Sequence, residues 1–445
     1  MSAYVINPNY VTGYSTYSRA SIGTYFDRSR TLQTAVANVQ RINWNPLTGA
    51  FEGVLVEPAR TNHLVQTNVA AYRLTLQQTV RFGAGYLTAG VPYTLSFYGT
   101  GSVTLSGVAA TTVMGTGAWA RTIVTITPGS GTLTFTPSGD VLYAQFEQGS
   151  YPTSWIPTTS AAVARAADVL GPPGMFQTSF TEPRADYNAA TTYSTGQEVR
   201  KETRIYRSLV DANLGNDPAT TSTGDALAKW VDIGPSNPFA CLDQSVGRAS
   251  VGSGAAYQTF ALLMGKDVDV VGLVGVVGSR VHVAINDLIG RIHTQSSTEV
   301  NDSIVLTASP GGRVVSVCVE STAAGDVRVG ECVVGAYEFI GRTEYGHEFS
   351  ILDFSIKSAD EQGESTFVEG PFSKLGSGTV WVEKADYNRV ARLGIALRAK
   401  PTVWVFTPDP AYSVGAIIYG NAADFKLLIS YPTENLLSLQ VQGLT

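Results

Sequence analysis

The stretch YTLSFYGTGSVTL (93–105) decides the fold class, because apolar residues occupy every second position on each side of a glycine-rich turn. Tyr93, Leu95 and Phe97 alternate with threonine and serine before the turn, and the same alternation resumes after it. A period of two places apolar side chains on one face of a strand and hydroxyl side chains on the other. The stretch therefore predicts an antiparallel hairpin with one buried face.

The same pattern recurs along the whole chain. Residues 123–127 and 132–136 repeat it around a Pro-Gly-Ser-Gly turn and predict a second hairpin, and valine-rich segments at 268–278 and 312–320 predict further strands. Strand candidates recur about every 8–12 residues, which is typical of sandwiches and barrels. Helical periodicity is nearly absent outside one short segment at 160–170. We predict an all-β protein made of several antiparallel, jelly-roll-like β-sandwiches.

Composition and charge exclude several classes of protein. Of the 445 residues only 15% are charged, against about 25% in ordinary globular proteins. The 44% hydrophobic and 10% aromatic content argues against intrinsic disorder. A net charge of −6 argues against a non-specific nucleic-acid binder. The first 15 residues do not resemble a signal peptide, and the apolar runs are shorter than the roughly 20 residues that span a bilayer. We therefore expect neither nucleic acid nor membrane insertion.

Two Gly-Pro breaks, at 171–174 and 234–238, predict the domain organisation, because neither can continue a strand or a helix. Residues before the first break are free of lysine, and those between the breaks are more polar and rich in tyrosine. The predicted parts are an N-terminal docking arm (1–23), a jelly-roll, lectin-like β-sandwich (24–170), a small central β module (175–238) and a C-terminal β-sandwich region (239–445).

No catalytic motif is present in the sequence. Serine-hydrolase, zinc-protease, phosphate-loop and dinucleotide-binding patterns are all missing. The three cysteines, Cys241, Cys318 and Cys332, form no CxxC pair, which favours buried thiols over a metal site or a disulfide framework. The four histidines have no metal-ligand spacing. We therefore predict no catalytic residue, no metal, no cofactor and no enzymatic activity.

The segment from residue 349 to 364 has two features that other strands lack. In FSILDFSI (349–356) the apolar phase slips between Ile351 and Leu352, which predicts a β-bulge. The next turn gathers the carboxylates Asp353, Asp360, Glu361 and Glu364. Two carboxylates about 5–10 Å apart suffice for glycoside hydrolysis without a local motif, so a glycan hydrolase remains an alternative to a solvated loop.

Four aromatic residues of the central module are the candidate carbohydrate-binding residues: Tyr187, Tyr193, Tyr206 and Trp230. Flat aromatic rings stack on the apolar faces of sugar rings, and this stretch concentrates them. The alternative is structural, because a module of this size has few other large side chains with which to fill a core.

Two segments resemble a signature of tailed-bacteriophage virion proteins. The first is residues 24–64, which contains Phe26-Asp27, Leu32, Asn38-Val39-Gln40-Arg41 and GVLVEPARTN (53–62). The second is AQFEQGSYPTSWIPTTSAAVARAADVL (144–170), which resembles the usual partner of that signature and closes a jelly-roll, lectin-like sandwich.

Two further resemblances cover the rest of the chain. Residues 185–230 are similar to small chitin-binding-type modules, whose pattern Tyr-x-x-Gly-x-x-Val, then Tyr and a closing Trp, occurs here as Tyr193, Gly196, Val199, Tyr206 and Trp230. Segments 230–243, 344–370 and 438–444 resemble the C-terminal region of phage tail and baseplate proteins.

The resemblance implies a structural virion protein of a tailed phage: a tail, tail-tip, fibre or baseplate component assembled in the host cytoplasm. It implies other virion proteins and a host-surface glycan as partners, and a homo-oligomer, with a trimer favoured because similar fibres and tips are trimeric. Three alternatives stay open. A depolymerase tail spike is disfavoured by the missing solenoid period, a spacer or decoration protein would have no ligand, and a free bacterial lectin would need a secretion signal.

Overall fold

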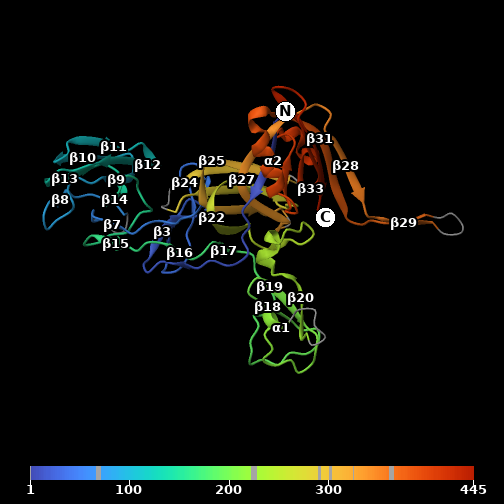
Figure 1. Cartoon of the computed structure of the whole chain (residues 1–445). Coiled ribbons are helices and arrows are strands. Elements are labelled where there is room, and N and C mark those ends of the chain that lie inside the picture. Colours follow the sequence, from blue (N-terminus) through green and yellow to red (C-terminus); the bar gives the residue numbers. More distant parts are fainter. Residues whose placement is uncertain are drawn as a thin grey trace. The chain divides into compact units, whose positions relative to one another are not determined.

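The computed structural model describes residues 2–66, 72–221, 228–288, 292–299, 303–323, 325–359 and 365–444. Strands make up 54% of the chain and helices 7%, which confirms the predicted all-β class. The chain folds as two compact units (Figure 1): unit 1 (1–15, 172–285 and 293–445) and unit 2 (16–171 and 286–292). In the described ranges no helix is both long and apolar enough to span a bilayer.

Unit 2 is a β-sandwich of two main sheets, ordered β11-β10-β13-β8 and β12-β9-β14. Its strands are β8 (Gln78–Phe82), β9 (Tyr93–Gly99), β10 (Ser102–Gly107), β11 (Thr111–Met114), β12 (Gly117–Ile126), β13 (Gly131–Ser138) and β14 (Leu142–Gln148). Their inward residues, among them Leu95, Phe97, Phe135 and Phe146, form one buried apolar core. The alternation in the sequence thus identified the buried faces of these strands.

Both predicted hairpins are wrong, because β9 and β10 lie in different sheets, as do β12 and β13. The glycine-rich segment after β9 carries the chain across the sandwich instead of folding it back on itself. Gly99 has a φ of +115°, and a Cβ there would lie 2.1 Å from the carbonyl oxygen of Asp140. Only glycine fits at this position. The glycine in the sequence therefore correctly indicated a tight backbone path, although the strands before and after it do not pair with each other.

Short two-stranded sheets complete unit 2 and contain the two segments that resemble the phage signature. They pair β2 (Tyr17–Ser18) with β16 (Val169–Leu170), β3 (Gly23–Phe26) with β4 (Leu32–Ala35), β5 (Ile42–Trp44) with β6 (Phe51–Val54), and β7 (Arg60–Asn62) with β15 (Val163–Arg165). One of the four sheets, β7 with β15, therefore joins the first segment (24–64) directly to the second, and β2 with β16 joins the residues just before the first segment to the second.

A buried network of ion pairs links the same two segments. The Asp168 carboxylate forms ion pairs with Arg41 Nη2 at 2.6 Å and with Arg19 Nη1 at 3.2 Å. All three side chains are 0% exposed. Glu57 pairs with Arg41 at 2.7 Å and also with Arg165. Charges this deeply buried are tolerated only when they are paired. The network therefore fixes how the two segments pack.

Asn62 makes a second link of the same kind. Its Nδ2 donates to the carbonyl oxygens of Ala144 (3.2 Å) and Ile156 (3.0 Å), while its Oδ1 accepts from the backbone N–H of Leu64 and Phe146. The side chain is fully buried. The signature residues Arg41, Glu57 and Asn62 thus hold the fold of unit 2 together.

Unit 1 is built on a 12-stranded sheet, ordered β24-β23-β25-β22-β27-β1-β32-β33-β34-β31-β28, with β17 paired to β22. Its strands are β1 (Ser2–Pro8), β17 (Gly174–Thr178), β22 (Tyr257–Val274), β23 (Arg280–Asn286), β24 (Ile292–Glu299), β25 (Ser303–Glu320), β27 (Glu331–Thr343), β28 (Glu348–Asp353), β31 (Phe372–Glu383), β32 (Thr402–Val405), β33 (Ile417–Leu428) and β34 (Glu434–Gly443). Because β31 also pairs with β27, the strands β27, β1, β32, β33, β34 and β31 form a closed ring.

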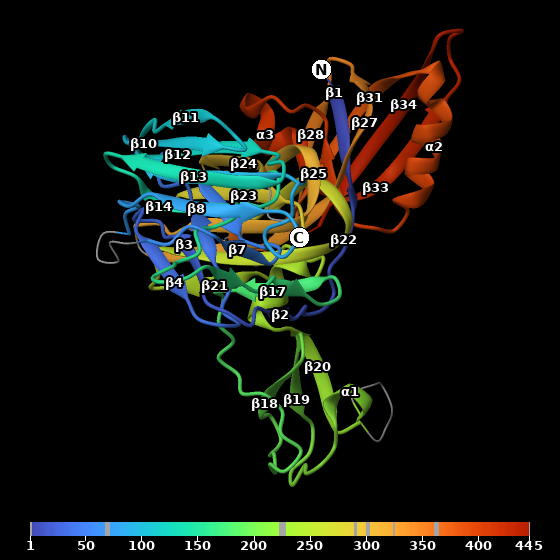
Figure 2. The ribbon, with the colours of Figure 1, turned by 90° about the vertical axis from the view of Figure 1, so that its left-hand side faces the viewer.

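The prediction that residues 1–23 form an N-terminal docking arm is wrong for residues 2–8, because these residues form strand β1 inside the large sheet. All seven residues of β1 pair with β27, and Tyr4 and Val5 also pair with β32. Figure 2 shows β1 in blue among the orange and red strands of the C-terminal part. Ala3, Val5 and Ile6 are buried in the core. The short run of alternation in this strand was too brief to be recognised in the sequence.

The central module of unit 1 is a three-stranded sheet of β18 (Glu198–Lys201), β19 (Arg204–Ser208) and β20 (Trp230–Pro235). The short helix α1 (Pro218–Thr221) lies in the connection between β19 and β20. Residues 175–178, expected to start the module, instead belong to β17, which pairs with β22 in the large sheet. The C-terminal region adds α2 (Tyr387–Ala396) and α3 (Ser413–Ala416).

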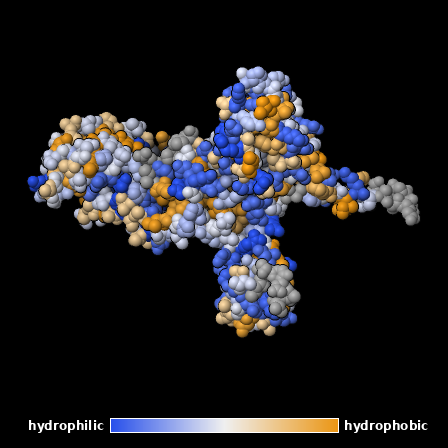
Figure 3. Space-filling model, viewed as in Figure 1, coloured by the Kyte–Doolittle hydropathy of each residue, from blue (hydrophilic) through white to orange (hydrophobic). Residues whose placement is uncertain are grey.

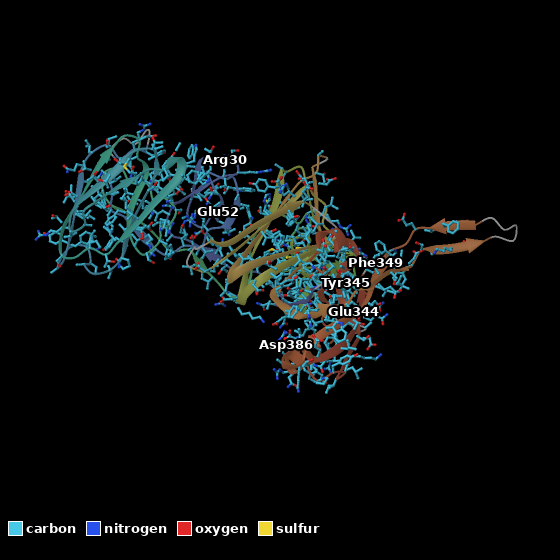
Figure 4. All side chains as sticks on the ribbon, turned by 90° about the horizontal axis from the view of Figure 1, so that it is seen from above. Arg30, Glu52, Glu344, Tyr345, Phe349 and Asp386 are labelled. Carbon is cyan, nitrogen blue, oxygen red and sulfur yellow. The ribbon has the colours of Figure 1, made fainter. Side chains whose placement is uncertain are left out.

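A long pair of strands extends from unit 1, and we call its described residues, 348–359 and 365–372, the arm (Figures 1 and 4). At its base β28 pairs with β31, and further out β29 (Ile356–Ala359) pairs with β30 (Ser365–Val368). The β-bulge predicted at Ile351 and Leu352 is wrong, because β28 pairs with β31 in unbroken register. The apolar phase slips because both faces of β28 are exposed. Of the predicted carboxylate cluster, Asp353 pairs with Lys357, and the other three residues lie outside the described ranges.

Candidate functional site

The four aromatic residues predicted to bind sugar are brought together as the core of the central module. Trp230 is 0% exposed, and its ring centroid lies 5.2 Å from that of Tyr193. Its indole N–H donates to the carbonyl oxygen of Asn216 at 2.9 Å. Tyr206 is also buried, and Tyr187 packs against the cluster from its edge.

This packing leaves little ring surface for a sugar. The faces of Tyr193 and Trp230 contact other rings, and Lys201 Nζ lies 5.5 Å from the ring centroid of Tyr187. Sugar contact by these four residues stays a prediction, and their burial counts against it.

Replacing Trp230 by alanine is expected to destabilise the module by about 3–5 kcal/mol, because a fully buried indole leaves a large cavity. Hydrogen exchange of β18–β20 in the full chain measures the effect. The exposed Leu214, also in the module, changed to alanine serves as the control. Unchanged exchange protection in the Trp230 variant would show that the ring is not a core residue.

A better-formed site lies in unit 2: a cavity of about 420 Å³ that we call the Trp119 pocket. It is formed by β3, β5, β6, β9, β12 and the loop after β14. Its lining includes Tyr25, Phe26, Asn43, Asn45, Glu52, Glu57, Tyr98, Trp119, Arg121, Thr153, Ser154 and Trp155. This volume falls within the range of small-ligand sites, about 300–1,000 Å³.

One wall of the Trp119 pocket is aromatic. Trp119 is 42% exposed, although most tryptophan surface in proteins is buried. Beneath it Phe26 is buried, with its ring centroid 6.2 Å from that of Trp119 and 5.6 Å from that of Tyr98.

Facing this wall are a carboxylate and two amides, on the β5–β6 hairpin (Figure 4 labels Glu52). Glu52 Oε2 accepts from Asn43 Nδ2 at 2.5 Å, and Oε1 accepts from Asn45 Nδ2 at 2.9 Å. Asn43 Oδ1 in turn accepts from the backbone N–H of Phe26, and Asn45 Oδ1 accepts from Leu47 and Thr48 in the hairpin turn. The amides therefore fix the orientation of the Glu52 carboxylate.

Two N–H donors of the lining residues are buried without a hydrogen-bond partner among the described residues: Arg121 Nε and Trp155 Nε1. The guanidinium is otherwise fixed, since Arg121 Nη2 donates to Ser96 Oγ and to the carbonyl oxygen of Thr153. Leaving such donors unpaired costs free energy, and because both atoms are buried, that cost is part of the energetics of the fold.

Glu57 also lines the pocket, but its carboxylate is engaged in the buried ion pairs that stabilise unit 2. Burial alone would raise its pKa, but the guanidiniums of Arg165 and Arg41 and hydrogen bonds from Ser154 hold the pKa well below its usual range. A carboxylate held ionised in this way cannot donate a proton near neutral pH.

The arrangement suits a polyhydroxylated ligand. An exposed aromatic face binds the apolar side of a ring, while an oriented carboxylate accepts hydrogen bonds from hydroxyl groups. Among the described residues no group of three metal-ligating side chains occurs, and the three cysteines are buried.

Sequence reasoning did not identify the Trp119 pocket, because its lining comes from segments about 130 residues apart in the chain. One local signal was available. In GAWA (117–120) a single tryptophan stands among small residues on a strand.

Comparisons with known proteins do not identify a family: no family model and no curated protein matches the chain. A chitosan-binding module of a chitosanase/glucanase from Paenibacillus sp. IK-5 is 14% identical over 22% of this chain and 81% of that one, with a TM-score of 0.19. A fucolectin from striped bass (Morone saxatilis) is 11% identical over 62% of this chain and 98% of that one, with a TM-score of 0.17. Both are sugar-binding proteins by name, but TM-scores this low carry no argument about this chain.

Proposed function

We propose that this chain is a structural protein of a tailed-bacteriophage virion that contacts host-surface glycan through the Trp119 pocket. The observation that carries the glycan part is the pocket itself, which is lined by an exposed Trp119 and by the oriented carboxylate of Glu52. Ligand sites commonly combine apolar walls with a few oriented polar groups.

The phage part of the proposal rests on the resemblance of segments 24–64 and 144–170 to a virion signature. The buried network of Arg41, Glu57 and Asp168 supports it in one respect, since it gives a physical reason for these two segments to occur together. The proposed place is the tail, tail tip or baseplate, with other virion proteins as partners.

We propose a binding role rather than catalysis. Glycoside hydrolysis requires one protonated and one ionised carboxylate. Of the two carboxylates that line the pocket, Glu57 is held ionised by Arg41 and Arg165, and both of its oxygens accept hydrogen bonds from Ser154, so it is neither a free acid nor a free base. The rival function is a glycan depolymerase. Incubation of the protein with host polysaccharide separates the two: released oligosaccharide would contradict a binding role.

Replacing Trp119 by alanine is expected to weaken glycan binding about five- to tenfold, because an aromatic contact contributes on the order of 1 kcal/mol beyond burial. The measurement is titration of the full chain with host-surface oligosaccharides. Glu52→Gln should weaken binding as well, since it removes the charge from the acceptor. Met114→Ala, on the other sheet and also exposed, is the matched control.

Equal affinity of the Trp119 variant and the native chain would contradict the pocket assignment. Localisation of the chain in intact particles by electron microscopy tests the virion assignment separately. A chain that binds glycan but is absent from particles would be a lectin of another kind. The central module, whose rings are buried, fits the spacer role that the sequence left open.

A further inference from the structure

The arm (348–359 and 365–372) exposes an unusual amount of apolar surface. Eight apolar side chains on it are exposed: Phe349, Ile351, Leu352, Phe354, Ile356, Phe367, Val368 and Phe372. They lie on both faces of the hairpin, and Figure 3 shows hydrophobic atoms along it. Exposed apolar patches of this kind mark interaction sites in soluble proteins.

The arm also lacks support from its own chain. The outer strands β29 and β30 pair with each other as a sheet of their own. A two-stranded hairpin alone in water is marginally stable at best. At the base, β28 is an edge strand of the large sheet. Among the described strands it pairs with β31 alone. An unpaired edge of this kind favours association with another chain.

The distribution of charge indicates which partner binds the arm. Among the described residues of the arm, Glu348, Asp353 and Glu369 are acidic and Lys357 is basic. Residues 387–400, which contain α2, have four basic residues and no acidic one, and of these four Arg389 pairs with Asp386 and Glu338. On this α2 surface Arg392, Arg398 and Lys400 are exposed, and Ile395 is 72% exposed. The chain therefore carries both an acidic, apolar arm and a basic surface with an apolar centre.

The two surfaces do not cover each other within one chain. Ile356 on the arm is 64% exposed, and the arm points away from the rest of unit 1 in Figures 1 and 4. We propose that the arm is an assembly element that docks on the α2 surface of a second copy of this chain. The acidic character of the arm argues against insertion into an anionic membrane, where basic residues are favoured.

The test is the association state of the full chain, measured by analytical ultracentrifugation over a range of concentrations. The arm variant is Ile356→Ser with Phe367→Ser, and the α2 variant is Arg392→Glu with Arg398→Glu. The control carries Val36→Ser and Met114→Ser, which are exposed apolar positions in unit 2. All altered side chains are exposed, and circular dichroism verifies that each variant folds.

We expect the native chain and the control to associate, and each variant alone to show a dissociation constant raised at least about tenfold. A mixture of the two variants should associate again, because the arm variant retains an intact α2 surface and the α2 variant retains an intact arm. A native chain that stays monomeric would overturn the proposal. So would variants that associate like the native chain, a mixture that stays monomeric, or a monomeric chain whose arm binds anionic phosphatidylglycerol vesicles.

Discussion

Deleting residues 1–8 is expected to abolish the folding of unit 1. The deletion removes β1, which pairs along its whole length with β27 and also pairs with β32. It opens the closed ring of strands and removes Ala3, Val5 and Ile6 from the core. Differential scanning calorimetry of the full and truncated chains should show the loss of the unit 1 transition while that of unit 2 remains.

A milder variant keeps this prediction measurable. Ile6→Ala should destabilise unit 1 by about 2–5 kcal/mol, the usual cost of a large-to-small change in a core. Ile429→Ala, at a position that is 72% exposed in the same unit, should be near neutral. If the truncated chain melts like the full chain, the N-terminus is an appendage rather than a central strand.

Replacing Asp168 by asparagine is expected to destabilise unit 2 by about 3–5 kcal/mol, because the change removes the buried counter-charge of Arg19 and one of the two counter-charges of Arg41. Arg19 and Arg41 both pair with this carboxylate. Asp168 Oδ2 also accepts from the backbone N–H of Glu57 at 2.8 Å. Urea denaturation of the full chain, followed by probes in unit 2, measures the loss.

The matched control is Asp140→Asn, which breaks a half-exposed ion pair with Arg73 in the same unit. Such surface pairs contribute about 0–1 kcal/mol, so the control should unfold almost like the native chain. Similar losses for the two variants would contradict the structural role of the buried network.

The network also predicts how stability depends on pH. The folded-state pKa of Glu57 is lowered, so its contribution is fully present above the unfolded value of about 4.3 and is lost as the pH falls below it. Unit 2 should therefore weaken between about pH 4 and the lower folded value. Because Glu57→Gln cannot titrate, it should flatten this part of the profile; an unchanged slope would contradict the assignment.

The all-β class was predictable because alternation records which side chains are buried. Tyr93, Leu95 and Phe97 are all in the core of unit 2, as their spacing predicted. Alternation does not record which strand is the neighbour. The adjacent strands β9 and β10 satisfy the same pattern by facing each other across the sandwich, so the hairpin prediction failed while the burial prediction held.

The candidate site was harder to predict for two physical reasons. The sequence does not distinguish an aromatic ring that faces water from one that packs against another ring. In this module Tyr193 and Trp230 pack against each other. The Trp119 pocket in turn combines Phe26, Glu52 and Trp155, which only the folded sandwich brings together. The exposed arm did leave a trace in the sequence, since the phase slip at Ile351 and Leu352 marks a strand with no buried face.

The most direct test of the central claim is a structure of the full chain with a bound host-surface oligosaccharide. We expect a sugar ring stacked on Trp119, with a hydroxyl group within hydrogen-bond distance of the Glu52 carboxylate. An oligosaccharide bound at the central module beside Tyr187, with the Trp119 pocket empty, would contradict it.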